Sequence, residues 1–214
     1  MKVEIWSDMI CPWCFVGKRR FEMALAEFVH RDEVEVIWRS FELDADAPRQ
    51  HPGTLLELLS NKYAVTVQQA AEMNERVSGF AREVGLEYHL ENALPGNTMD
   101  AHRLMHFAVS RGVGDRAIER IMTAYFSEAM PVGDRAALAR LAPEFGISES
   151  DALAMLESDS YVEAVRADEA RAEMFKVRGV PFFVFDEKFG VSGAQPVAKF
   201  ADALNQAREA SIKT

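Results

Sequence analysis

Two cysteines three positions apart carry the clearest chemistry in this sequence. Cys11 and Cys14 form a Cys-Pro-Trp-Cys motif and are the only cysteines among the 214 residues. Two thiols at this spacing can close into a small disulfide ring and reopen. The attacking species in disulfide exchange is the thiolate, which a helix N-terminus stabilises through its free N–H groups and its dipole. The motif therefore predicts a redox-active pair in which Cys11 attacks and Cys14 resolves the mixed disulfide.

Two other interpretations of the cysteine pair compete with redox chemistry. A structural disulfide is disfavoured because so small a ring removes little chain entropy. A zinc site is the stronger alternative, since His102 and His106 are four residues apart on an expected helix and could join Cys11 and Cys14 as ligands. The zinc alternative makes the protein a non-enzymatic binding module, whereas the redox interpretation needs no metal.

A proline at the entrance of a buried strand is the second candidate for the site. Val180-Pro181 opens the apolar run that continues to Phe185. A proline cannot donate a hydrogen bond to a strand neighbour, so its presence there needs a reason. We expect a cis Val180–Pro181 bond beside the thiols, leaving a backbone edge with which an extended substrate could pair.

The elements that would position these residues form two halves. In the first half, strand-like residues 3–7 lead into the cysteine motif, a helix follows, and residues 34–43 return as a strand. In the second half, residues 180–185 and 190–192 read as a hairpin with a turn at 186–188. Pro196 then suits the first position of a last helix. The inward positions expected for the first helix are Phe21, Leu25, Phe28 and Val29.

The residues between the two halves are expected to be entirely helical. Thr66 and Gln69 have the spacing of a capping box, and Gly85 suits the end of the helix that follows. Further helices are expected to begin near Asn97-Thr98, Asp115, Asp134 and Ser150, and Met73 is expected among the inward positions of the helix after Thr66. The pattern predicts an α/β protein with a thioredoxin-like fold, made of a βαβ half and a ββα half and interrupted by a large all-helical insertion. The predicted boundaries are residues 1–46 and 177–214 for the thioredoxin-like domain and 47–176 for the insertion.

Charge and hydropathy limit the classes of partner that are expected for this protein. The formal net charge is −10, from 24 basic and 34 acidic side chains. Nucleic acids and anionic membranes require basic surfaces, so neither is expected as a partner. The first residues alternate like a strand instead of forming the long apolar stretch of an export signal, and no segment has the length of a membrane-spanning helix. We therefore expect a cytoplasmic protein.

Four motifs, taken together and in this order, resemble the DsbA family of thiol-disulfide oxidoreductases, and within it the FrnE-like branch. They are Ser7-Asp8-x-x-Cys11-Pro12-Trp13-Cys14-x-x-Gly17, Asn97-Thr98-x-x-Ala101-His102-Arg103-Leu104, Val180-Pro181-Phe182-Phe183 and Gly193-Ala194-Gln195-Pro196. The resemblance covers nearly the whole chain. It implies a thioredoxin domain interrupted by helices, with Cys11 as nucleophile, Cys14 as resolving thiol and Pro181 as the cis-proline.

The resemblance also implies an activity and its limits. It implies an enzyme that reduces, isomerises or oxidises protein or small-molecule disulfides, with no cofactor beyond the Cys11–Cys14 pair and with glutathione as a possible reductant. Strongly oxidising members carry a histidine where this chain has Trp13, so we expect a weaker oxidant. An alternative from the wider family is a glutathione-dependent isomerase of the 2-hydroxychromene-2-carboxylate type, but those relatives have a serine at the position of Cys11.

Several neighbours of the motifs are predicted to serve the same site. Asp8 and Glu42 are candidates for a buried proton carrier near Cys14, although a helix-cap or surface role is the competing interpretation. His102 and Arg103 could face the thiols from the insertion or could merely pair with nearby carboxylates. The residues predicted to bind substrate are Pro12, Trp13, Val180, His102 and Arg103.

Overall fold

A four-stranded mixed sheet lies at the centre of the protein. The structure, a computed structural model, describes residues 1–212; residues 213 and 214, the end of the predicted second half, lie outside that range. The strand order is β2-β1-β3-β4. β1 pairs in parallel with β2 and antiparallel with β3, and β3 pairs antiparallel with β4. The strands are β1 (Lys2–Ser7), β2 (Glu35–Ser40), β3 (Phe182–Phe185) and β4 (Phe189–Ser192).

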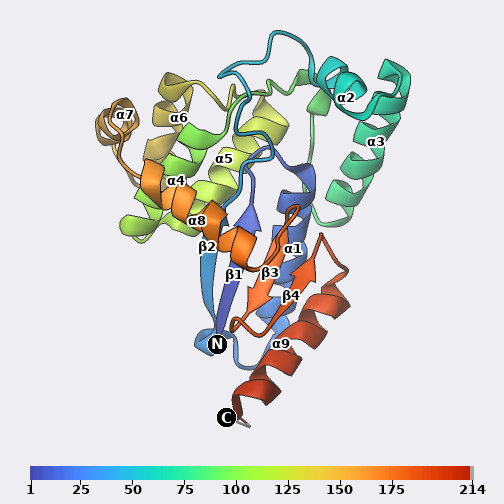
Figure 1. The fold of residues 1–214 in the computed structure, drawn as a ribbon, viewed down its shortest axis with the longest axis vertical. Helices are drawn as coiled ribbons and strands as arrows, with labels where there is room; N and C mark the ends of the chain where they lie inside the picture. Colours follow the sequence, from blue (N-terminus) through green and yellow to red (C-terminus); the bar gives the residue numbers. More distant parts are fainter. Residues whose placement is uncertain (213–214) are drawn as a thin grey trace.

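Helices cover both faces of the sheet, which explains why β1 is buried on both sides. On one face, α1 (Pro12–Glu27) and α9 (Val197–Ile212) pack together through Phe21, Phe183 and Phe200. On the other face, α8 (Val162–Met174) contacts the sheet around the wholly buried Trp6. β1 is thus sandwiched, and its carboxyl end delivers the cysteine motif to the start of α1 (Figure 1).

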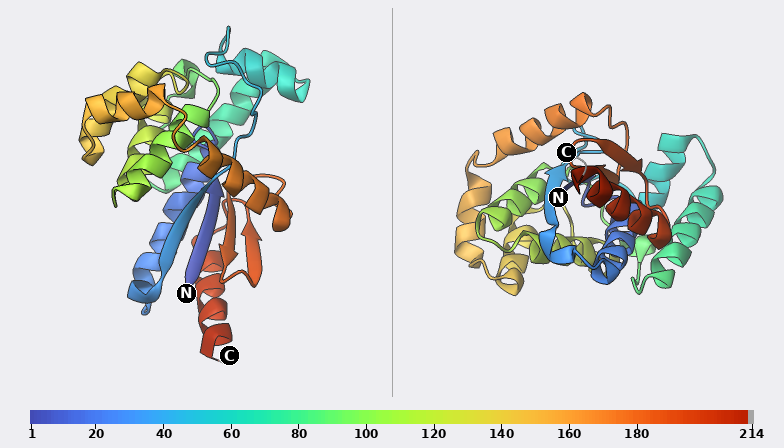
Figure 2. Two further views of the ribbon diagram at one scale, coloured as in Figure 1. Left: turned by 60° about the vertical axis from the view of Figure 1, so that its left-hand side comes forward. Right: turned by 90° about the horizontal axis from the view of Figure 1, so that it is seen from below.

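The inserted helices form two groups at the end of the sheet away from both chain termini (Figures 1 and 2). A pair of helices, α2 and α3, lies on one side, and the remaining helices gather around α4 on the other. None of the helices within residues 1–212 is long and apolar enough to cross a membrane. The bounds are α2 (Leu55–Tyr63), α3 (Val67–Glu83), α4 (Met99–Ser110), α5 (Gly114–Glu128), α6 (Arg135–Leu141) and α7 (Glu149–Glu157).

Local signals explain where several of these helices begin. The expected capping box is present at Thr66, whose hydroxyl accepts from the N–H of Gln69 while the Gln69 side chain accepts from the N–H of Thr66. The carboxylate of Asp134 caps α6 by accepting two backbone N–H groups. The sequence interpretation did not separate α2 and α8 as helices of their own.

Two expected core positions are wrong. Val29 is 89% exposed because α1 already ends at Glu27, and the chain leaves the helix before Val29 can face inward. Met73 is exposed on α3. The pair of helices α2 and α3 lies to one side of the molecule, and only a narrow face of α3 is buried.

Candidate active site

The cysteine motif occupies the junction between β1 and α1. Cys11 is the N-cap of α1 and has an extended backbone, with φ −85° and ψ 110°. Both cysteines are free thiols, 4% exposed at Cys11 and 1% exposed at Cys14. The first turn of α1 contains no acidic residue, so the positive end of the helix dipole is not offset by its own side chains. The Cys11 sulfur therefore lies at the positive end of the α1 dipole.

The second thiol is in a less favourable place for charge. Burial, followed by the hydrogen bond and charge of the neighbouring Cys11, raises the pKa of Cys14 well above its usual value. A hydrogen bond from the backbone of Asp8 opposes that shift. The raised pKa favours the protonated form of Cys14.

A cis-proline lies beside the first thiol, as the sequence predicted. The Val180–Pro181 bond is cis, and the Sγ of Cys11 is 3.6 Å from the carbonyl oxygen of Val180. Gly17, one turn further along α1, faces the same proline, because an added Cβ would be 2.8 Å from the Cγ of Pro181. The absence of a side chain at Gly17 lets Pro181 approach the helix that carries the thiols.

The two inner residues of the motif contact the helical insertion. The hydroxyl of Tyr88 donates to the carbonyl of Pro12 at 2.8 Å. Trp13 is 38% exposed and its ring lies 5.3 Å from that of Phe80 on α3. Burial, followed by the charge of Cys11, raises the pKa of Tyr88, so its hydroxyl keeps its proton and remains a donor. Trp13 alone of these side chains has a large accessible surface next to Cys11.

His102 lies behind the thiols instead of facing a substrate. Its side chain is wholly buried on α4, and its Nε2 is 3.3 Å from the Oδ1 of the equally buried Asp8. The other carboxylate oxygen of Asp8 accepts from the N–H of Leu43 at 2.7 Å. The Nδ1 of His102 has no hydrogen-bond partner among residues 1–212. The prediction that His102 binds substrate is therefore not supported, because no part of its side chain reaches the surface.

Arg103 is also placed away from the thiols, which corrects its prediction as a substrate-binding residue. It is 1% exposed, and its Nη1 donates to Asp100 at 2.6 Å. Its remaining donors bind the carbonyls around the end of α7, those of Met155, Leu156, Ser158 and Ser160. These contacts occupy the guanidinium completely, so Arg103 stabilises the insertion.

Glu42, the other predicted proton carrier, takes part in an ion pair. Its Oε2 is 2.7 Å from Arg166 of α8, and its Oε1 accepts from Asn97 at 3.3 Å. Burial raises the pKa of Glu42, although the charges of His102 and Arg166 oppose the shift. A raised carboxyl pKa suits proton transfer, yet the partners found are Arg166 and Asn97 and not Cys14.

A second buried charge cluster joins α8 to the sheet. Glu4 binds Arg39 at 2.7 Å and Arg171 at 2.7 Å, and Arg39 also binds Asp168 at 2.8 Å. Burial alone would raise the pKa of Glu4 and of Asp168, but hydrogen bonds outweigh it and lower both. The decisive bonds to Asp168 come from His106 and from the backbone of Ser40.

The zinc alternative receives no support from this placement. His106 is directed to Asp168, at 3.1 Å, while His102 is directed to Asp8. In the part of the chain that the structure describes, no three His, Cys, Asp or Glu side chains are arranged to hold a metal ion.

The site contains neighbours that the sequence did not reveal. From the insertion, Phe80 contacts Trp13 and Tyr88 contacts Pro12. These residues are far from the cysteine motif in the sequence, and no local pattern predicts the contacts. Gly17 stands in the quoted cysteine motif, but its contact with Pro181 depends on the tertiary structure.

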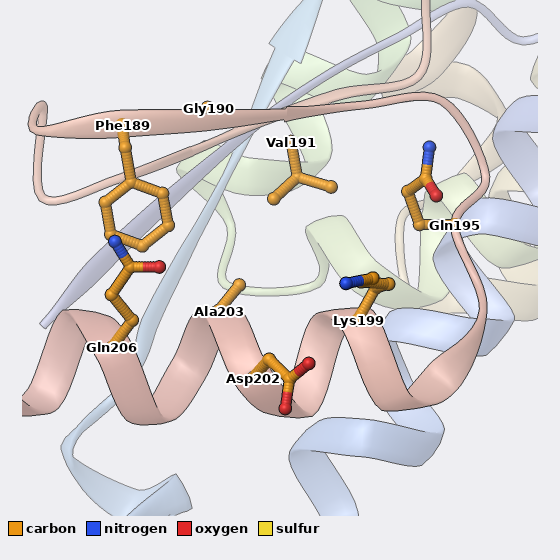
Figure 3. Close-up of a pocket in the computed structure, with 8 residues that line it drawn as sticks. All are labelled: Phe189, Gly190, Val191, Gln195, Lys199, Asp202, Ala203 and Gln206. Carbon is orange, nitrogen blue, oxygen red and sulfur yellow. The ribbon is translucent and has the colours of Figure 1, made fainter.

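A surface groove of about 310 Å³ lies elsewhere, between β4 and α9 at the edge of the sheet (Figure 3). Phe189 and Val191 line it from the strand, and Lys199, Ala203 and Gln206 line it from the helix. None of these is a predicted site residue.

The fold and the cysteine pair define a thioredoxin-like protein with an inserted helical region and a dithiol at the start of its first helix. The chain matches the DSBA-like thioredoxin domain family over residues 2–205 and belongs to that family. The predicted family and the predicted fold, a thioredoxin-like domain with a helical insertion, are thereby confirmed. The FrnE-like branch and the boundaries at 46/47 and 176/177 stay predictions.

Solved structures agree with this assignment. A crystal structure of a probable DsbA oxidoreductase from Streptomyces coelicolor has 42% sequence identity and a TM-score of 0.94, covering 98% of this chain and 90% of that chain. A 2-hydroxychromene-2-carboxylate isomerase is 12% identical with a TM-score of 0.71, each chain covered fully. A cytosolic disulfide reductase, DsbM from Pseudomonas aeruginosa, is 16% identical with a TM-score of 0.67, covering 97% of this chain and all of that chain. The last two are similar to this chain in fold alone.

Proposed function

We propose that this DsbA-like protein is a thiol-disulfide oxidoreductase that exchanges disulfides through Cys11 and Cys14. The observation that carries the proposal is the asymmetry of the two thiols. Cys11 lies at the N-terminus of α1, 3.6 Å from the Val180 carbonyl, whereas Cys14 is buried behind it with a raised pKa. Cys11 is placed to attack a substrate disulfide, and Cys14 stays protonated until it resolves the mixed disulfide.

The steps follow from this division. The Cys11 thiolate attacks one sulfur of a substrate disulfide, forming a mixed disulfide and releasing the other sulfur as a thiolate that takes up a proton. Cys14 then loses its proton and attacks the Cys11 sulfur, closing the Cys11–Cys14 disulfide and releasing the second substrate thiol. The dithiol is oxidised by two electrons and the substrate is reduced to two thiols; the reverse sequence oxidises a substrate dithiol.

The neighbouring backbone supports a role in docking. Val180 and Pro181 border Cys11, and Pro181 has no N–H to give to a strand neighbour. We propose that substrate lies along Val180 and Pro181 and contacts the exposed ring of Trp13, next to Pro12. Protein and small-molecule disulfides and thiols are the proposed partners.

The redox direction is proposed from the motif and the compartment. Trp13 supplies no imidazolium beside the thiolate, so we propose a reductase or isomerase of the FrnE-like branch with glutathione as reductant and no other cofactor. A cytoplasmic location fits this direction, because the cytosol keeps thiols reduced. A protein of the same fold bears the name cytosolic disulfide reductase.

Cysteine variants test the proposal directly. We expect Cys11→Ser to abolish reduction of insulin disulfides by dithiothreitol as electron donor, and Cys14→Ser to accumulate mixed disulfides visible by mass spectrometry. Unfolding curves of both variants serve as the folding control. Wild-type rates from Cys11→Ser would overturn the proposed roles. Turnover of 2-hydroxychromene-2-carboxylate without insulin reduction would favour the isomerase alternative, and stoichiometric zinc bound to unreactive cysteines would favour the binding module.

A further inference from the structure

Two cations without partners lie on the segment that leads from α8 into the cis-proline. Lys176 and Arg178 are exposed, and within residues 1–212 neither side chain forms a hydrogen bond, an ion pair or a ring contact. The arginines just before them behave differently, since Arg166 and Arg171 each bind two carboxylates.

The segment that carries Arg178 ends beside the reacting sulfur. Val177 is buried against the core beneath α8, and Pro181 is buried against α1, so both ends of the intervening stretch are anchored. Arg178 is two residues before Val180, whose carbonyl is 3.6 Å from the Sγ of Cys11. A Cβ added at Gly179 would meet nothing within 4 Å, so no described atom crowds that side of the backbone between Arg178 and Val180.

The position along the segment favours Arg178 over Lys176 as the group that acts. Lys176 is four residues before Val180 and precedes the buried Val177, whereas Arg178 is two residues before Val180. Asp44 and Asp46 follow β2, on the far side of β1 from β3. The N-terminus of α1 adds its positive dipole end on the side of Cys11. A negative group bound near Val180 would thus meet Arg178 and the start of α1.

We propose that Arg178 binds a carboxylate of the substrate, so that Cys11 reacts preferentially with disulfides and thiols that carry negative charge next to sulfur. This inference rests on the thiol-disulfide exchange proposed above and specifies its substrate class. Two sources share this chemistry: a small thiol compound with a carboxylate, and an acidic stretch of polypeptide around a cysteine. Arginine suits the task because its planar guanidinium binds a carboxylate through two hydrogen bonds.

The test compares three small disulfides of different charge: 3,3′-dithiodipropionate, bis(2-hydroxyethyl) disulfide and cystamine, which are anionic, neutral and cationic. The rate of oxidation of the reduced protein is followed by alkylating the remaining thiols and measuring mass. We expect Arg178→Ala to slow the reaction with the anion about three- to tenfold, the size expected for a unit charge pair near a protein surface. It should leave the neutral disulfide unchanged and speed the reaction with the cation.

A matched control removes the effect of overall charge. Arg140 is exposed on α6 and has no side-chain partner within residues 1–212, so Arg140→Ala makes the same change in net charge away from the thiols. We expect Arg140→Ala to behave like the wild type and Arg178→Lys to retain part of the preference, because lysine keeps the charge but not the paired hydrogen bonds. The preference of the wild type should also weaken between low salt and about 0.5 M salt, since screening shortens the range of charge interactions.

Each outcome separates the two proposals. Reaction with all three disulfides at rates that Arg178→Ala leaves unchanged, or slows equally, overturns the role of Arg178 and preserves disulfide exchange. Reaction with none of them overturns both. Cystine peptides flanked by Glu or by Gln then identify the source. A stronger dependence on Arg178 for the Glu peptide than for dithiodipropionate indicates a polypeptide, and the opposite order indicates a small thiol compound.

Discussion

A single methyl group at Gly17 should disturb the site without touching a thiol. The added Cβ of Gly17→Ala would lie 2.8 Å from the Cγ of Pro181 and 3.5 Å from the Cα and Cβ of Ala194. Carbon atoms pack at about 3.5–4.0 Å, so Pro181 must move by roughly 0.7–1.2 Å. The Pro181 ring is tied to the backbone, and its displacement carries the Val180 carbonyl away from Cys11.

The stability and the activity of Gly17→Ala should therefore change by different amounts. Overpacking costs about 1–3 kcal/mol, while alanine in place of glycine inside a helix returns about 1 kcal/mol. The free energy of unfolding should fall by about 0–2 kcal/mol. A displacement near 1 Å at a reacting centre can cost up to about 10²-fold in rate. We expect insulin reduction to fall about tenfold or more.

Gly79 provides the control for this substitution. It lies inside α3, where an added Cβ would meet only a terminal nitrogen of Arg82 at 3.8 Å. Gly79→Ala should raise the free energy of unfolding by up to about 1 kcal/mol and leave activity unchanged. Urea unfolding and insulin reduction are measured for both variants. If Gly17→Ala matched Gly79→Ala in both measurements, the steric argument would be refuted.

Three further predictions concern the rest of the molecule. Arg103→Met should lower the free energy of unfolding in urea by about 1–3 kcal/mol, because the buried carbonyls of Met155 and Leu156 lose their donor while Asp100 keeps its ion pair with Arg135; an unchanged free energy of unfolding would contradict this. Trp13→His should make the thiol pair more oxidising by about 30 mV against a glutathione buffer, through an imidazolium that stabilises the reduced form, and an unchanged potential would rule out this effect of the imidazolium. Glu4 and Asp168 have lowered pKa values when folded, so their stabilisation is present above their ordinary values of 4.5 and 3.8 and is lost as the pH falls below them. The urea midpoint should drop as the pH falls from about 5 to about 3, and Asp168→Asn should show a smaller drop.

Much of the fold could be predicted because its signals are local. Strand alternation, the capping box at Thr66 and the spacing of the two cysteines each depend on a few adjacent residues. The cis bond at Pro181 was also predictable, since a proline cannot donate to a strand neighbour and a cis bond accounts for its place at the entrance of a buried strand. The prediction that Val29 is buried was wrong for the opposite reason, because the apolar spacing continues in the sequence beyond Glu27, where α1 ends.

The roles of His102 and Arg103 could not be predicted from spacing. Neighbouring residues on a helix point about 100° apart, so the two side chains had to face different surroundings. His102 meets Asp8 behind the thiols, whereas Arg103 meets the end of α7. The face of α4 that lies toward the sheet is determined by helices that lie far apart in the sequence. The sequence of α4 alone therefore does not indicate which residue faces which neighbour.

The buried contact between Asp8 and His102 indicates what the insertion does for the site. Both side chains are wholly buried, and the backbone of Asp8 also holds both cysteines, accepting from the N–H of Cys11 at 3.2 Å and donating toward the sulfur of Cys14. A buried polar group left without its partner is costly, so the imidazole fixes the carboxylate and with it the loop that carries the thiols. On the opposite side, Tyr88 fixes the carbonyl of Pro12. The inserted helices therefore hold the cysteine motif from two directions, while the surface left open to substrate is formed by Trp13 and the segment that ends at the cis-proline.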